Sequence, residues 1–357
     1  MKKTLLLFSF LVISAAEAQT MSTVLAGTNT GIGQSLHPSG IAIHDNFLYA
    51  GTGMNANIIY KVDLSQSNTS PSIFISGLGK ITDICFRGNY LYASEYNHPN
   101  PNRIIRIDVS QPNPVVENVV EMYLPTGLTI YNQYLYARSK NNIFRINLDM
   151  PGQEPEVIAS DLIGSGTVGL AVIGNYLFVS EREQGKLVKY SLVTPNPTKI
   201  VVATGLSSIS GIVKGETNNI IYAAIGSSSG EIYRVNTTNG TYTLFVTTPL
   251  TMNWDMLYTD NKLYVSDVEG NEVIKIGVNA LSVDDVEASK IKAYPVPSSD
   301  IVNFENCTFL GLTDVRGKQI DIKSNNAQID IAPLPSGIYI AKIEAEGKTS
   351  YKKIVKN

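Results

Sequence analysis

One phrase recurs six times in this chain, and it constrains the possible folds more than any other feature. Each copy has a short apolar run, a turn such as Asp-Asn or Gly-Asn, and a strand-like run around an aromatic residue. The aromatic residues are Tyr49, Tyr92, Tyr136, Phe178, Tyr222 and Tyr264. Their successive spacings are 43, 44, 42, 44 and 42 residues. A spacing this regular indicates one structural unit that is repeated.

Each repeat contains four runs of the β-branched and aromatic residues that favour strands. In the first repeat these runs fall at residues 40–43, 47–50, 58–64 and 72–76. Turn residues separate them, and no helical periodicity interrupts the pattern. Four strands in about 40 to 45 residues are typical of one propeller blade. The sequence therefore predicts an all-β fold, with a six-bladed β-propeller over residues 19–281.

The sixth repeat is one strand short. It has strand-like runs near residues 254–258, 262–266 and 272–277, and no fourth run follows. A matching run lies at the other end of the chain, because residues 22–27 resemble the blade-ending segments at 73–77 and 200–205. Pairing of this N-terminal strand with the sixth blade would remove an open sheet edge. We therefore expect the N-terminal strand to close the propeller.

The first residues have the pattern of a targeting segment. Lys2 and Lys3 give a basic start, residues 5–13 are apolar, and small side chains precede residue 19. This pattern predicts a secretory signal peptide over residues 1–18, cleaved between Ala18 and Gln19. The apolar run is shorter than the roughly 20 residues that span a bilayer. Since no comparable run follows, we expect no transmembrane segment in the mature protein.

The composition excludes several classes of protein. The chain has 357 residues, of which 43% are hydrophobic and 17% charged, so a core is available and disorder is not indicated. Its 28 basic and 31 acidic side chains leave no basic excess for phosphates, so nucleic acid is not an expected partner. Two cysteines cannot supply a four-thiolate zinc site.

The repeated phrase also resembles a known group of proteins. Gly-Ile/Leu-Ala/Thr-Ile followed by Leu-Tyr-Ala/Val-Ser-Glu/Asp is similar to the six-bladed propellers of the NHL-repeat and gluconolactonase-like group. The resemblance covers about residues 21–278. It implies the propeller fold, but the group includes lactonases, lyases and interaction modules, so the activity is left open.

The last seventy or so residues contain three motifs in order: Tyr-Pro-Val-Pro at 294–297, Gly-Lys at 317–318 and Leu-Pro-Ser-Gly-Ile-Tyr at 334–339. This ordered set resembles a different family, the type A C-terminal sorting domain of the type IX secretion system. The resemblance implies export by the type IX secretion machinery, followed by release or attachment at the cell surface. The third position of the first motif has Val296 where the family usually has Asn. Alternating strands and turns predict a small Ig-like β-sandwich over residues 290–357, after a linker at 282–289. The motif residues are Tyr294, Pro295, Pro297, Gly317, Lys318, Leu334, Pro335, Gly337 and Tyr339.

The innermost strands of a propeller line its central channel, so equivalent positions of the repeats form rings. Metal-dependent members of the gluconolactonase-like group hold a divalent cation with acidic and amide side chains, mainly just before the first Gly of the phrase. In this chain those positions have poor ligands for a hard cation: Ser39, Thr82, Thr126, Val168, Ser210 and Trp254. We therefore predict no metal and no cofactor, and a structural or catalytic divalent cation is without support.

Two of the Gly positions themselves are acidic, Asp83 and Asp255. They could act as an acid and base pair, or each could cap a turn or accept a hydrogen bond from a neighbouring backbone amide. Glu95, which belongs to a ring with acids on alternate repeats, and His37 complete the candidate catalytic residues. The acids of that ring commonly have a structural role in the group.

Trp254 is the only tryptophan, and it lies between Asn253 and Asp255. A flat aromatic ring beside amide and carboxylate groups suits the face of a sugar or peptide, although Trp254 could equally fill the channel as core. The loop at residues 96–102, with Tyr96 and His98, could overhang the same opening. The sequence thus predicts a secreted or surface-attached module that binds a glycan or peptide at the channel mouth. The alternative is a secreted hydrolase or lyase.

Overall fold

The computed structural model describes residues 20–27, 36–53, 57–66, 70–97, 99–164, 169–278, 292–314, 318–325, 327–345 and 348–357. The chain divides into two compact units, Met1–Val278 and Asn279–Asn357. All described elements are strands except one short 3-10 turn, η2 (Arg182–Gln184), so the all-β prediction is confirmed. None of the described helices could cross a membrane. The predicted signal peptide, its cleavage site at Ala18 and Gln19, and the linker lie outside the described residues.

The described part of the first unit contains four-stranded antiparallel sheets, five of which use strands that are consecutive in the chain. The first is β2 (Pro38–His44), β3 (Phe47–Thr52), β4 (Ile58–Asp63) and β5 (Ser72–Ser76). The second is β6 (Lys80–Arg87), β7 (Tyr90–Tyr96), β8 (Arg103–Asp108) and β9 (Val116–Glu121). The third is β10 (Pro125–Tyr131), β11 (Tyr134–Ser139), β12 (Asn142–Asn147) and β13 (Glu156–Ala159). The fourth is β14 (Leu170–Ile173), β15 (Tyr176–Glu181), β16 (Lys186–Ser191) and β17 (Ile200–Thr204). The fifth is β18 (Ile209–Lys214), β19 (Ile220–Ile225), β20 (Glu231–Asn236) and β21 (Tyr242–Thr247).

The sixth sheet combines the two ends of this unit. It contains β22 (Asn253–Thr259), β23 (Lys262–Asp267) and β24 (Glu272–Gly277), and its outer strand is β1 (Met21–Ala26). β1 pairs antiparallel with β24, from Met21 opposite Ile276 to Ala26 opposite Glu272. Leu25 of β1 is buried in a cluster that includes Ile41 of the first sheet. The N-terminal strand therefore connects the last sheet to the first.

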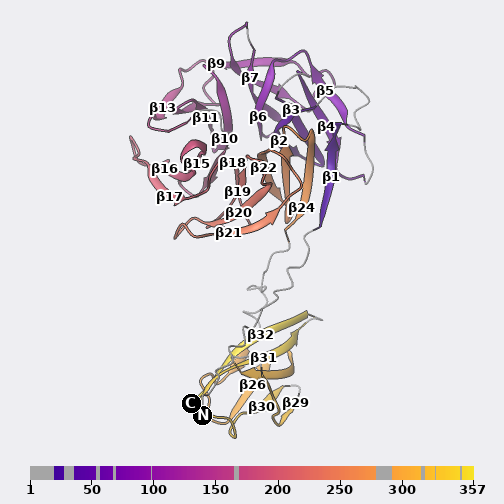
Figure 1. Ribbon diagram of the computed structural model, residues 1–357, viewed down its shortest axis with the longest axis vertical. Helices are drawn as coiled ribbons and strands as arrows, with labels where there is room; N and C mark the ends of the chain where they lie inside the picture. Colours follow the sequence, from indigo (N-terminus) through magenta and orange to yellow (C-terminus); the bar gives the residue numbers. More distant parts are fainter. Residues whose placement is uncertain are drawn as a thin grey trace, which may run out of the picture. The chain divides into compact units, whose positions relative to one another are not determined.

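The first strands of the six sheets form a ring. Each contacts the first strand of the next sheet, and β22 contacts β2 (Figure 1). The ring is tight where the glycine of the repeated phrase meets its neighbour. A Cβ on Gly40 would collide with the backbone of Asp83, and one on Gly211 would lie 2.6 Å from the carbonyl oxygen of Trp254. Glycine is used at these positions because no side chain fits between the strands.

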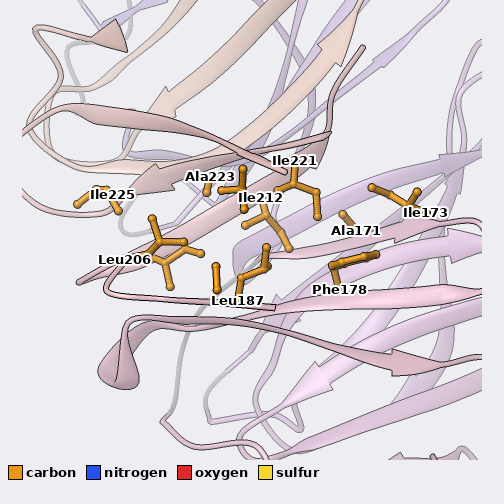
Figure 2. Close-up of a cluster of buried hydrophobic side chains, with 12 residues drawn as sticks. Ala171, Ile173, Phe178, Leu187, Leu206, Ile212, Ile221, Ala223 and Ile225 are labelled. Atoms are coloured by element: carbon orange, nitrogen blue, oxygen red, sulfur yellow. The ribbon is translucent and has the colours of Figure 1, made fainter. Parts of the chain in front are cut away.

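Hydrophobic side chains fill the space between neighbouring sheets. Figure 2 shows one such layer, in which Phe178 of β15 and Leu187 of β16 face Ile212 of β18 and Ile221 of β19. Alternate residues of each strand contribute to such layers, as the period of two predicts. The sheets are thus held together by side-chain packing.

The aromatic residue of each repeat lies directly opposite a basic residue of the third strand. The pairs are Tyr49–Lys61, Tyr92–Arg106, Tyr136–Arg145, Phe178–Lys189, Tyr222–Arg234 and Tyr264–Lys275. Directly opposed side chains contact each other on one face of a sheet, and a cation over an aromatic ring is favourable. Lys61 Nζ lies 5.4 Å from the centroid of the Tyr49 ring, and Lys189 Nζ lies 5.7 Å from that of Phe178. All six aromatic residues are buried, so the recurring position also contributes to the packing between sheets.

The second unit contains two four-stranded sheets. One has the order β25 (Lys292–Tyr294), β26 (Ile301–Glu305), β30 (Gln328–Asp330) and β29 (Ser324–Asn325). The other has β28 (Gln319–Ile320), β27 (Thr308–Asp314), β31 (Gly337–Ala345) and β32 (Lys348–Lys356). Their shared core includes Val302, Phe304, Leu312, Ile329, Ile343 and Ile354.

Most of the sorting-motif residues have a local structural role in this unit. The Tyr294 hydroxyl donates to Glu305 Oε1 at 2.6 Å, and the Tyr339 hydroxyl donates to the carbonyl oxygen of Pro335 at 2.8 Å. The Lys318 amide donates to Asp314 Oδ1 at 2.9 Å, and Leu334 packs against the core. Pro295 and Pro297 follow cis peptide bonds, and Gly337 begins β31. Gly317 lies outside the described residues.

Leu25→Ala tests whether β1 is an integral part of the first unit. Leu25 is 1% exposed, so we expect the substitution to lower the free energy of unfolding by about 2 to 4 kcal/mol in urea denaturation. Ser22→Ala, at an exposed position of the same strand, should change it by less than about 0.5 kcal/mol. Equal stability of the two variants would contradict the packing of β1 in the sixth sheet.

Candidate functional site

The six first strands enclose a cavity of about 240 Å³. All six contribute to its wall, mostly with the residues that follow the Gly position of the repeated phrase. The two carboxyl groups of the wall belong to Asp83 of β6 and Asp255 of β22, and the amine is that of Lys214 at the end of β18. Both aspartates therefore line the centre of the ring, as expected for rings of equivalent positions.

Asp83 connects the second sheet to the third. The side chain is 4% exposed. Its Oδ1 accepts a hydrogen bond from the amide of Ile84 at 2.7 Å, and its Oδ2 accepts one from the amide of Leu128 at 2.6 Å. A carboxylate is thus hydrogen-bonded across the seam between β6 and β10.

Asp255 makes the same pair of contacts between the sixth sheet and the first. Its Oδ1 accepts from the amide of Met256 at 2.7 Å, and its Oδ2 accepts from the amide of Ile41 at 2.9 Å. Its own amide donates to the hydroxyl of Ser266 at 3.0 Å. Each aspartate therefore bonds neighbouring backbone amides and lines the cavity at the same time.

Burial changes the acidity of this pair. It raises the pKa of Asp83 well above its usual value, and the negative charge of Asp255 raises it further. Burial also raises the pKa of Asp255, to about 7, against the opposing effect of the hydrogen bonds from Ile41 and Met256. Because two interacting acids titrate as a unit, the pair retains proton at pH values where an exposed aspartate is ionised. The pKa of Cys85 is raised by its own burial and by both carboxylates.

The acids at the ends of the second strands are bonded to backbone amides. Glu95 accepts from the amide of Gly79 at 2.6 Å and pairs with Arg103 at 2.5 Å. In the fourth and sixth sheets, Glu181 accepts from the amide of Ile163 at 2.9 Å, and Asp267 accepts from that of Thr251 at 2.6 Å. Each of these acids holds the loop that leads into the first strand of its own sheet. In the described part of the chain, no group of acids, histidines or cysteines could hold a metal ion.

His37 precedes β2 and has a φ of 42°. Its ring Nδ1 lies 2.6 Å from the carbonyl oxygen of Val268, and its amide donates to Asn271 Oδ1 at 3.0 Å. These contacts join the first sheet to the turn between β23 and β24. His98 lies outside the described residues.

Trp254 lies at the end of the ring where the first strands begin and the second strands end, and we call this end the mouth. The antiparallel register places both ends together, for example Lys80 opposite Tyr96 and Asn253 opposite Asp267. Trp254 is partly buried, and Asn253 is fully buried. The carbonyl oxygen of Asn253 accepts from the hydroxyl of Ser210 at 2.6 Å, so Asn253 joins the sixth sheet to the fifth.

The partner of Trp254 is Arg182, which the sequence did not single out. Arg182 Cζ lies 5.9 Å from the centroid of the Trp254 ring, and its Nη2 donates to the carbonyl oxygen of Gly226 at 2.6 Å. The Trp254 Nε1 atom is buried and finds no acceptor among the residues that the structure describes. An unsatisfied buried donor costs about 1 to 3 kcal/mol. A ligand at the mouth therefore meets the Trp254 ring and the Arg182 guanidinium, and not this buried donor.

Two further cation and aromatic pairs lie at the mouth. Lys80 Nζ is 5.9 Å from the ring centroid of Tyr96, and Lys140 Nζ is 4.5 Å from that of Tyr123, which is 62% exposed. Lys140 and Arg182 occupy the same position of the repeat as Tyr96, one residue after the ring that contains Glu95. An alignment of the repeats at that position would have found both cations from the sequence.

Residues 292–357 match the family of secretion system C-terminal sorting domains. The match covers the predicted sorting motif and continues to the last residue. The protein is therefore exported by the type IX secretion system, to the cell surface or the extracellular space. No curated protein matches the chain as a whole.

Solved structures resemble the chain over most of its length. An auxiliary nutrient binding protein from Bacteroides thetaiotaomicron has 16% identity and a TM-score of 0.57, over 72% of this chain and 76% of its own. Regucalcin from Agrobacterium tumefaciens, a calcium-binding protein, has 10% identity and a TM-score of 0.54, over 68% and 90%. Virginiamycin B lyase from Staphylococcus aureus has 15% identity and a TM-score of 0.50, over 94% and 99%. At these identities the likeness shows the fold alone: the first unit is a β-propeller similar to the NHL-repeat and gluconolactonase-like proteins.

The raised pKa of Asp255 predicts how stability depends on pH. Its pKa is about 7 in the folded protein and about 3.9 in an unfolded chain, so between these values the folded state binds more protons. The free energy of unfolding should therefore fall as the pH rises from about 4 through about 7, by up to about 1.4 kcal/mol per pH unit for one group. Denaturant titrations at a series of pH values measure this slope.

Asp255→Asn should reduce that slope, because the titrating group is removed. Asp260→Asn is the matched control, since Asp260 is exposed in the next turn, and it should retain the slope of the unaltered protein. A slope in Asp255→Asn equal to that of the control would show that Asp255 does not titrate in this range.

Proposed function

We propose that the six sheets of the first unit are the blades of a six-bladed β-propeller that β1 closes as the outer strand of the sixth blade. The ring of first strands and the pairing of β1 with β24 support this architecture. We assign residues 1–18 to the signal peptide, 19–281 to the propeller, 282–289 to the linker and 290–357 to the sorting domain. The two four-stranded sheets of the second unit support an Ig-like sandwich.

The function we propose for the exported protein is the binding of a glycan or peptide at the mouth of the propeller. One observation supports it above others: the guanidinium of Arg182 lies beside the Trp254 ring at the mouth, and none of the described carboxylates pairs with it. Binding sites combine an aromatic surface with a few polar groups that fix orientation, and this pair provides both. The sequence predicts contacts at Trp254, Asn253, Asp255, Tyr96 and His98. We retain Trp254 and Tyr96 as contact residues, together with Arg182, and His98 lies outside the described residues.

The acids near the mouth support binding over catalysis there. Glu95, Glu181 and Asp267 are about 1% exposed, and each accepts hydrogen bonds from backbone amides. A general acid or base has to reach a substrate proton within hydrogen-bond distance, which these buried carboxylates do not. His37 likewise has its Nδ1 beside a backbone carbonyl.

Trp254→Ala tests the proposed binding site. On an array of glycans and peptides, we expect the unaltered protein to bind at least one class of ligand and the variant to lose that binding, since the stacking surface is removed. Tyr176→Ala is the control, because Tyr176 also lies under a cation, Lys189 Nζ at 4.6 Å, but at the other end of the propeller. A binding profile that Trp254→Ala leaves unchanged would remove Trp254 from the site.

The alternative function is that of a secreted hydrolase or lyase, with Asp83 and Asp255 as the acid and base. The raised pKa values of this pair, in a cavity at the centre of the ring, are the observation that favours it. Both carboxylates already accept two backbone hydrogen bonds, which limits their part in proton transfer.

A panel of lactones tests this alternative. If the pair is catalytic, the protein will hydrolyse at least one lactone, and Asp255→Asn will lower kcat by about 100-fold or more. Asp260→Asn should leave kcat unchanged. The absence of turnover, or turnover that does not depend on Asp83 and Asp255, would exclude the pair as the catalytic acid and base.

A further inference from the structure

The Arg182 side chain connects three blades at the mouth. It belongs to η2 in the fourth sheet, donates to Gly226 in the fifth, and lies against Trp254 of the sixth. The hydrogen bond to Gly226 uses one of the five N–H groups of a guanidinium. Among the described residues no carboxylate pairs with Arg182 within 4 Å. The cation is therefore available for an anionic group from outside the protein.

The acidic residues on either side of Arg182 in the chain contact other residues. Glu181, which precedes it, is bonded to Ile163 and Lys199. The side chain of Glu183, which follows it, lies against Gly164, where a Cβ would come within 3.0 Å of its carboxyl carbon. The cations Lys80 and Lys140 are on the second and third sheets, and exposed acids at the same end include Glu121 on the second sheet, Glu183 on the fourth and Glu269 on the sixth. Cations and acids thus alternate around the mouth, and Arg182 is the cation that lies beside Trp254.

The Trp254 ring restricts which class of ligand could bind beside Arg182. Its flat ring suits the face of a sugar. A carboxylate accepts two hydrogen bonds from a guanidinium, since it has two oxygens. A sugar ring that carries a carboxylate therefore suits both the aromatic surface and the cation.

We propose that the mouth binds an acidic glycan, with a uronic acid residue stacked on Trp254 and its carboxylate bonded to Arg182. This inference rests on the proposed binding function and specifies its ligand. Lys140 over Tyr123 and Lys80 over Tyr96 repeat the combination of cation and aromatic ring on the third and second sheets. A chain of several uronic acid residues would use these pairs as well, which a single sugar would not.

The test is calorimetric titration of the mature protein with tetragalacturonic acid, with cellotetraose as the neutral sugar and tetraglutamate as the acidic peptide. We expect tetragalacturonic acid to bind, more weakly as the salt concentration rises, and the other two to bind at least about ten-fold more weakly. Arg182→Gln should weaken binding by about ten-fold or more, and Lys140→Gln by a few-fold. Lys189→Gln, in the matched pair with Tyr176, should have no effect.

Each other outcome overturns the inference in a distinguishable way. If cellotetraose binds as tightly as tetragalacturonic acid and Trp254→Ala abolishes this binding, the site at the mouth is supported. Recognition of a carboxylate by the site is then excluded. Equal binding of tetraglutamate would exclude the sugar ring, and no binding of tetragalacturonic acid would exclude the acidic glycan. Should Arg182→Gln fail to fold, as judged by circular dichroism, Lys140→Gln at its exposed position decides between these outcomes.

Discussion

The close approach of the six first strands is the constraint on which the rest of the first unit depends. Gly40 and Gly211 leave no room for a side chain against the next strand, and Asp83 and Asp255 hydrogen-bond across two of the seams. A ring this narrow encloses a cavity of only about 240 Å³. The two carboxyl groups at its centre both hold neighbouring strands together.

Because these carboxyl groups bond backbone amides, we place the candidate site at the mouth of the ring and not at its centre. The carboxylates that resemble catalytic groups in the sequence accept backbone hydrogen bonds, both in the cavity and at the ends of the second strands. The loops that they hold form the base of the mouth. Arg182 and Trp254 lie there, and the guanidinium and the ring face are the groups that a ligand could use.

The period of the repeats predicted the fold because it can be read from the sequence without knowledge of any contact. The spacing of the aromatic residues gave the strands of each sheet, and the similarity of residues 22–27 to the blade ends identified the strand that pairs with β24. The motifs of the last residues identified the sorting domain. In each case the signal lies in residues that are close in sequence or equivalent in the repeat.

The site was only partly predictable. Trp254 was found because it is unique, but its contact with Arg182 joins the fourth sheet to the sixth, and a sequence contains no distance between such residues. Whether Asp83 and Asp255 bond amides or face substrate was likewise open, because the amides of Leu128 and Ile41 belong to neighbouring sheets. The direction of a side chain at the boundary between two sheets depends on how the sheets pack. A local sequence pattern does not specify that packing.

A crystal structure of the mature protein soaked with tetragalacturonic acid tests the central claim most directly. We expect a sugar ring on the face of Trp254, with a carboxylate within hydrogen-bond distance of Arg182. A ligand bound in the cavity between Asp83 and Asp255, with the mouth empty, would contradict it.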